Sequence, residues 1–197
     1  MTSLKKSKEL LDLAEKNNDQ ILAKVKSAAS WHSGKGLSLT TPNPLGHIHA
    51  MKDALCKSQI NAQCIKYIEA HGTGSKVGDL AEAQAIEEVL AADQGATSCV
   101  VSSLKSTVGH LEVCSGIASC IRAVMSIRHQ VVPGVSSLLK INPEINTQRV
   151  KINTSTQPMD YENGVVGLLA YGLGGVSSFV LLEPYTNSKV SNNICET

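Results

Sequence analysis

The hydrophobic and polar positions of the chain predict an alternation of strands and helices. Residues 4–16 carry Leu10 and Leu13 at helical spacing among charged residues, which predicts a short amphipathic helix on the surface. The run ILAKVKSAAS from Ile21 is typical of a strand, and the Gly-, Pro- and Ser-rich run SGKGLSLTTPNP after it is typical of a loop. We therefore expect the globular unit to begin at Ile21.

Two units of strand, loop and helix are predicted after Pro44. The first follows a helical pattern that ends near Lys57, and it consists of the strand IKYIEA, the glycine-rich turn HGTGSKVG and a helix over residues 79–92. The second consists of the strand SCVVSS, the loop KSTVGH and the helix LEVCSGIASCIRAVMSIRH. Alternation of this kind favours an α/β domain whose sheet is largely parallel.

The final third of the chain predicts strands and then a tail. A long irregular connection after Pro133 leads to the run KINTST, and VVGLLAYGLGGVSSFVLLEP places two apolar runs around a glycine turn. These runs are expected to be buried strands that can pair antiparallel. The Asn- and Ser-rich tail has too few apolar residues to order itself. The predicted organisation is a helix or linker over 1–20, one domain over 21–185 and a disordered tail over 186–197.

Composition narrows the classes of partner. The chain has 197 residues, and 18 Lys and Arg against 17 Asp and Glu give a net charge of +1. This near-neutral balance without a basic run argues against nucleic acid and against a polybasic membrane patch. The six cysteines show no CxxC pair and no framework spacing, which is typical of reduced intracellular thiols. With no apolar run near the 20 or so residues that span a bilayer, we expect a cytoplasmic chain and no membrane partner.

Two polar loops follow predicted parallel strands, where ligands of such sheets bind. In the first, Gly72, Gly74 and Gly78 are spaced G-x-G-x-x-x-G, which fits neither the dinucleotide fingerprint nor a P-loop, and His71 taken alone is best interpreted as a turn residue.

The second loop gathers Lys105, His110 and Glu112 around Gly109. A single loop of this kind is usually solvated, but two histidine loops at equivalent strand ends can both donate N–H bonds to one oxygen that develops negative charge. The residues therefore point to an oxyanion or enolate site.

Two weaker patterns give no site of their own. The glycines of AYGLGGVSS are explained by a hairpin turn. His47, His49 and Cys56 have no recognised metal-ligand spacing, so no metal is expected.

Taken together, EAHGTG at 69–74, KSTVGH at 105–110 and YGLGG at 171–175 resemble the β-ketoacyl synthase (ketosynthase) family of fatty acid and polyketide synthases. The likeness covers the chain to about Tyr185, and GTGSKVGD and CSGIAS look closest to multidomain synthases. The resemblance implies an α/β, thiolase-like fold of two similar halves. This chain is similar to the C-terminal half, with layered helices on a mixed, mainly parallel sheet.

The resemblance also implies chemistry for named residues. His71 and His110 match the two histidines that promote decarboxylation of a malonyl thioester and stabilise the enolate that attacks an acyl thioester. Lys105 matches the lysine that supports the second histidine, with Glu112 as its structural partner.

Other positions match the family's binding elements. The phosphopantetheine arm of the substrate is expected to contact Thr73 and Ser75, where Ser75 replaces the usual Thr. No cofactor is expected to be bound. The gating loop corresponds to Gly172, Leu173, Gly174 and Gly175.

Some positions depart from the family pattern. Leu173 stands where the gate is usually Phe, and the usual Thr, Asn and His after the double glycine are replaced by Val176, Ser177 and Phe179. No cysteine lies in the context of the family's nucleophile, so condensation by the covalent route needs an N-terminal half.

The expected partners are therefore an acyl carrier protein, that N-terminal half and a second copy of the complete domain. The alternatives are a non-catalytic module that binds the carrier arm, or a truncated inactive paralogue.

Overall fold

The computed structural model describes residues 2–34, 43–92, 98–135 and 137–185. The predicted tail over 186–197 and most of the loop GLSLTTPNP lie outside the described residues.

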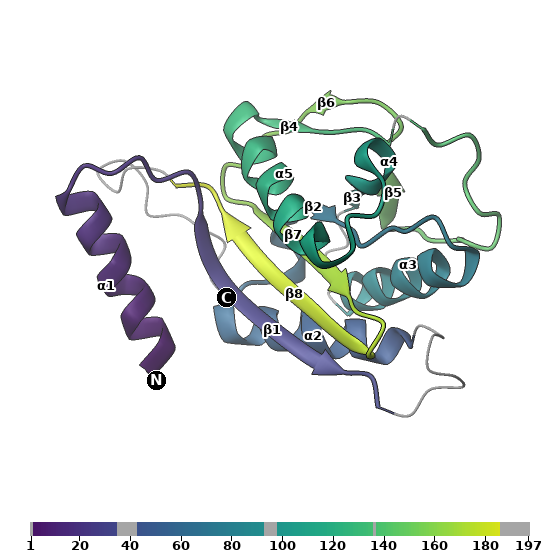
Figure 1. Cartoon of the computed structure of the whole chain (residues 1–197), viewed down its shortest axis with the longest axis horizontal. Coiled ribbons are helices and arrows are strands. Elements are labelled where there is room, and N and C mark those ends of the chain that lie inside the picture. Colours follow the sequence, from purple (N-terminus) through teal and green to yellow (C-terminus); the bar gives the residue numbers. More distant parts are fainter. Residues whose placement is uncertain (1, 35–42, 93–97, 136, 186–197) are drawn as a thin grey trace.

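A six-stranded sheet forms the centre of the fold, in the order β1-β8-β7-β2-β3-β5 (Figure 1). Four neighbouring strands run parallel, and β8 and β1 continue the sheet in antiparallel pairings. This confirms the mixed, mainly parallel sheet and the antiparallel closing strands. The strands of this sheet are β1 (Lys24–His32), β2 (Ile65–Glu69), β3 (Cys99–Ser102), β5 (Val150–Ile152), β7 (Val165–Tyr171) and β8 (Val176–Glu183).

Helices cover both faces of the sheet (Figure 1). One face carries α2 (Pro44–Ser58) and α3 (Lys76–Ala91), and the other carries α5 (Ser115–His129). The predicted N-terminal helix is confirmed as α1 (Thr2–Lys16), which lies outside these layers; the Tyr185 hydroxyl donates to Glu15 Oε1 at 3.1 Å. The short elements are η1 (Ala62–Cys64), α4 (Lys105–Val108), η2 (Glu112–Cys114), β4 (Val131–Val132) and β6 (Gln157–Pro158).

The alternation of side chains along each strand builds two cores. Ile68 packs in the core with Met51 and Ile86 from α2 and α3, whereas its neighbour Tyr67 packs in the core with Ala123 from α5. Because β2 is buried on both sides, its sequence has no polar face, as expected for a central parallel strand.

Two local predictions need correction. The loop KSTVGH contains one helical turn, α4, which ends because Gly109 adopts φ +74° and donates its N–H to Lys105 O at 3.0 Å. The helix predicted over 79–92 begins earlier, at Lys76, because the Ser75 hydroxyl caps it by accepting the Gly78 N–H at 3.2 Å. Ser75 therefore shapes the turn after β2.

The topology brings the predicted site together. Strands β2 and β3 are adjacent and parallel, with Glu69 paired to Ser102, so the loops that follow them leave the same edge of the sheet. Strand β7 runs parallel to β2 on its other side, and its turn into β8 emerges at that edge as well.

Candidate active site

A pocket of about 660 Å³ lies where these loops meet. The loop after β2, the segment after α4 and the turn after β7 each contribute to its wall. The sequence predicted that the first two would converge. Its lining includes His47, His71, Thr73, Ser75, Asp79, Glu82, His110, Glu112, Tyr171 and Leu173.

The backbone of His71 is held from beneath. Glu82, which is buried on α3, accepts the N–H of His71 at 2.6 Å and the N–H of Gly72 at 2.8 Å. Gly72 has φ +44°, and a Cβ there would lie 2.6 Å from Ser103 Cβ, so this close approach of two loops requires glycine. The loop that carries His71 is therefore fixed by both α3 and the loop after β3.

The imidazole of His71 is neutral and has a defined tautomer. Burial and the nearby charges of Lys105, His110 and His47 lower its pKa to about 4. The backbone N–H of Tyr171 donates to His71 Nδ1 at 3.4 Å, so the ring proton lies on Nε2.

His110 has the same tautomer, but different groups hydrogen-bond to its Nδ1. The backbone N–H of Glu112 donates to His110 Nδ1 at 3.0 Å, and the Ser115 hydroxyl lies 2.9 Å from the same nitrogen. Because Nδ1 accepts, the Nε2 of a neutral ring carries the hydrogen. The His71 and His110 rings meet edge-on with centroids 5.3 Å apart. Two N–H donors at this separation suit one oxygen that gains negative charge.

The comparison with protein families identifies the family of the chain. The model of the "Beta-ketoacyl synthase, C-terminal domain" matches residues 22–138, which include both histidine loops. The chain belongs to the β-ketoacyl synthase family. Polyketide synthase ThaG of Burkholderia thailandensis is 34% identical over 91% of this chain. The 6-methylsalicylic acid synthase of Penicillium patulum is 32% identical over 86% of it. The chain spans only 4% and 10% of the lengths of these two relatives.

Solved ketosynthase domains share the fold. The oxazolomycin ketosynthase domain of Streptomyces albus superimposes with a TM-score of 0.84 at 26% identity, over 91% of this chain and 32% of that one. The module 6 ketosynthase of the Bacillus subtilis bacillaene synthase gives a TM-score of 0.85 at 22% identity, over 89% and 33% of the two chains. These likenesses confirm the thiolase-like fold and the match to part of a ketosynthase domain.

Lys105 faces a second pocket in this ketosynthase chain. That pocket has a volume of about 530 Å³ and shares Thr73, Asp79 and Glu82 with the first. Burial lowers the pKa of Lys105, and the carboxylates of Glu82 and Glu69 oppose that shift. The lysine thus acts electrostatically on His71, whose pKa it helps to lower.

Glu112 serves His110 through its backbone. The described hydrogen bonds and ion pairs join its N–H to His110 and include none from its carboxylate. The predicted partnership between Glu112 and Lys105 stays a prediction.

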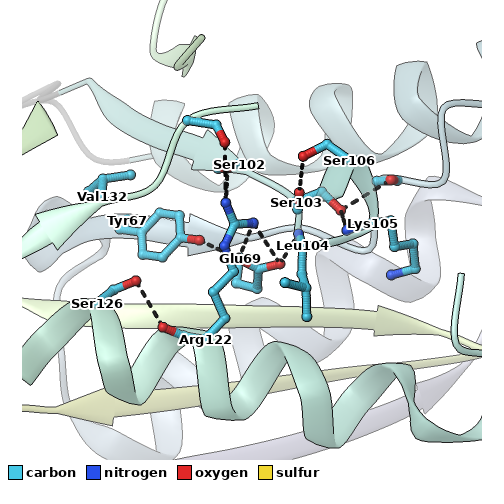
Figure 2. A network of polar contacts seen from close by, with 12 residues as sticks. Tyr67, Glu69, Ser102, Ser103, Leu104, Lys105, Ser106, Arg122, Ser126 and Val132 are labelled. Atoms are coloured by element: carbon cyan, nitrogen blue, oxygen red, sulfur yellow. Dashed lines mark hydrogen bonds and ion pairs between the residues drawn. The ribbon is translucent and has the colours of Figure 1, made fainter. Parts of the chain in front are cut away.

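A buried ion pair anchors the loop after β3 (Figure 2). Glu69 is fully buried, and its carboxylate contacts Arg122 Nη1 at 3.2 Å and accepts the Leu104 N–H at 2.6 Å. The Tyr67 hydroxyl donates to the same carboxylate, and Arg122 Nη2 donates to Ser102 Oγ at 3.1 Å. The network ties β2, β3 and α5 together and holds Leu104, the residue before Lys105.

The expected arm-binding residues and gate lie at the mouth of the first pocket. Thr73 is exposed, with its hydroxyl 3.4 Å from that of Ser75. In the turn after β7, the Gly175 N–H donates to Gly172 O at 2.8 Å, and Leu173 is 77% exposed. Phe179 lies apart from the pocket, because it is fully buried beneath Gly167 in the core.

Sequence reasoning missed several pocket residues. His47 on α2 was given no role, yet it is buried and lines the pocket. Asp79 and Glu82 also line it, and Asp79 Oδ1 accepts the Gly74 N–H at 3.1 Å. Carboxylates in the first two turns of a helix that follows a glycine loop are a signal for such contacts.

The described ranges contain neither a cluster of metal ligands nor a membrane-spanning helix. In those ranges no group of three His, Cys, Asp or Glu residues is placed to hold a metal ion. None of the helices there combines the length and apolar character needed to cross a bilayer.

Proposed function

We propose that this chain supplies the decarboxylating half of a β-ketoacyl synthase site, which acts in polyketide or fatty acid biosynthesis. The observation that carries the proposal is the shared tautomer of His71 and His110. Both rings accept at Nδ1, so both offer Nε2–H to one pocket.

The chemistry follows from these donors. A malonyl thioester binds with its thioester oxygen between the two Nε2–H groups. The bond from Cα to the carboxylate breaks, CO₂ leaves, and the electron pair of that bond forms an enolate whose oxygen the two histidines stabilise. The enolate carbon then attacks the carbonyl of an acyl thioester and expels its thiolate. Burial keeps His71 neutral, and the charge of Lys105 adds to this effect.

The acyl thioester is proposed to be held on a cysteine of an N-terminal ketosynthase half. This chain spans 32–35% of the solved ketosynthase chains that it matches. The short helix η2 and helix α5 together offer a docking face of apolar residues at four-residue spacing: Val113 of η2 (97% exposed), and Ile117 (61%), Ile121 (59%) and Met125 (39%) of α5. An apolar stripe of this kind is typical of a protein interface.

An acyl carrier protein is the proposed donor of the substrates. Its phosphopantetheine arm would pass the mouth of the pocket, where Thr73 Oγ1 donates to Ser75 Oγ at 3.4 Å and the Ser75 hydroxyl keeps its own hydrogen to donate to the arm. The complete domain is proposed to act as a homodimer.

The test is CO₂ release from malonyl-pantetheine by the purified chain, alone and with a purified N-terminal half. We expect release that His71→Ala and His110→Ala each reduce by at least 100-fold, on the order of one lost oxyanion donor. If neither the chain nor the mixture releases CO₂ while both proteins are folded, the proposal fails.

A second candidate is a module that binds the carrier arm without turnover. The exposed Leu173 favours this candidate, because the position where the family usually has Phe provides no aromatic ring to close the pocket. Binding of pantetheine without CO₂ release in either experiment would support this candidate over the first.

A further inference from the structure

A third imidazole lines the histidine pocket and takes no part in the proposed enolate chemistry. His47 lies in the first turns of α2 and is 2% exposed. Its ring meets Tyr171 edge-on at 5.4 Å, and Tyr171 in turn meets His71 edge-on at 6.2 Å. The Tyr171 ring thus contacts both histidines, on two sides of the same pocket.

The tautomer of His47 follows from its burial. Its Nδ1 is sealed from solvent and has no hydrogen-bond partner among the described residues, which leaves Nε2 as the ring nitrogen that can serve the pocket lined by His47. Burial lowers its pKa to about 4, so the ring is neutral near pH 7. A buried N–H without an acceptor is rarer and more costly than an unmet lone pair, which favours the proton on Nε2. His47 therefore presents an N–H to the pocket, as His71 and His110 do.

The wall behind His47 is polar. Ser33 Oγ and Ser177 Oγ are also buried without a partner in the described part of the chain. They flank Gly46, where a Cβ would lie 2.2 Å and 2.9 Å from them, and Ser177 pairs with Tyr171 across β7 and β8. Among the described residues, three of the five buried side-chain atoms that lack a hydrogen-bond partner thus gather in this corner. Neither serine lines the pocket, so His47 is the side chain through which this corner meets a substrate.

We propose that His47 is a specificity-determining residue whose Nε2–H donates a hydrogen bond to an oxygen on the substrate's acyl chain. The pocket then prefers 3-oxoacyl and 3-hydroxyacyl thioesters to saturated thioesters of the same length. His71 and His110 remain free for the thioester oxygen, so His47 does not compete with them for an acceptor. The inference rests on the proposed function, since it concerns thioesters bound in the same pocket.

The test compares the binding of 3-oxobutyryl-pantetheine and butyryl-pantetheine to the full 197-residue chain labelled with ¹⁵N-histidine. NMR reports the tautomer of each ring and the dissociation constant of each thioester. The oxo compound should shift the His47 Nε2 signal and bind roughly 2- to 12-fold more tightly, which is the range for one neutral hydrogen bond.

Two variants separate a donor from a packing role. His47→Gln keeps an N–H and should retain the preference, whereas His47→Phe keeps the bulk and should lose it. Equal affinity of the wild-type chain for the two thioesters, no binding of either, or an unchanged preference in His47→Phe would each overturn the inference. This test measures a ratio of binding affinities and not CO₂ release. A failure of the decarboxylation test can therefore be distinguished from a failure of this inference.

Discussion

The carboxylate of Glu82 holds the backbone of His71, whose N–H donates to Glu82 Oε1 at 2.6 Å. The second oxygen accepts the Gly72 N–H at 2.8 Å, so one buried side chain fixes two consecutive peptide groups of the loop that carries His71. Desolvation nevertheless raises the pKa of Glu82 to about 7, against the two hydrogen bonds that favour the carboxylate. The loop is therefore held by a group that titrates near neutrality.

This coupling predicts a pH-dependent stability. A carboxyl whose pKa is raised on folding stabilises the fold fully below its unfolded pKa of 4.5, and this contribution is lost as pH rises through about 7. His71 and His47, with pKa values lowered to about 4, act in the opposite direction, since their stability is lost as pH falls below 6.5. The pH dependence of the unfolding free energy of the wild-type chain therefore combines the opposing contributions of Glu82 and of the two histidines.

The variant Glu82→Gln isolates the carboxyl. Relative to Glu82→Gln, the wild-type free energy of unfolding should fall by up to about 3 kcal/mol between pH 4.5 and 7.5. Urea denaturation across this range measures the difference. A difference that stays constant with pH would show that Glu82 does not titrate in the folded chain.

The pattern of apolar and polar residues was sufficient to predict the helices and strands. It did not show which side chains far apart in the sequence contact one another. Apart from Lys66 and Glu69, the runs of β2 and β3 are largely apolar because both faces of these strands are buried, and α2 and α5 show helical periodicity. His47, by contrast, occupies a buried helical position like Ile48 and Met51, so the pattern interprets it as core. Glu69 likewise gains its meaning from Arg122, 53 residues away. The two histidine loops could be predicted because each is a polar loop that directly follows an apolar strand run. This succession is visible in the local sequence.

Gly72 and Gly74 offer a matched pair of substitutions in the His71 loop. Both have positive φ, +44° and +82°, but a Cβ at Gly72 would meet Ser103 at 2.6 Å whereas nothing lies within 4 Å of one at Gly74. We expect Gly74→Ala to cost about 1 kcal/mol of backbone strain, and Gly72→Ala to cost roughly 1–3 kcal/mol more. Thermal or urea unfolding measures both. Equal costs would mean that Ser103 moves away freely.

The Gly72 substitution should also reach the proposed site. Displacement of Ser103 disturbs the carbonyls of His71 and Gly72, to which its hydroxyl donates at 3.4 and 3.1 Å. Malonyl decarboxylation should therefore fall further in Gly72→Ala than in Gly74→Ala at a temperature where both are folded.

The pair of Glu69 and Arg122 predicts a large stability effect. Arg122→Met leaves a fully buried carboxylate with only the Tyr67 and Leu104 donors, which should cost roughly 3–5 kcal/mol of unfolding free energy. The double variant Glu69→Gln with Arg122→Met removes both charges and should recover part of that loss. If the double variant is less stable than Arg122→Met by as much as Glu69→Gln alone destabilises the wild type, the two groups are not coupled.

The exposed stripe on α5 gives a prediction that separates docking from folding. Ile117 is 61% exposed, so Ile117→Asp should change the unfolding free energy of the isolated chain by less than about 0.5 kcal/mol. If the stripe docks an N-terminal half, an aspartate in the dry interface lacks a partner and should weaken association by at least 10-fold. Leu10→Asp, on α1 and 68% exposed, is the matched control and should leave association unchanged. Titration of the purified N-terminal half by calorimetry measures both, and equal affinities for wild type and Ile117→Asp would place the interface elsewhere.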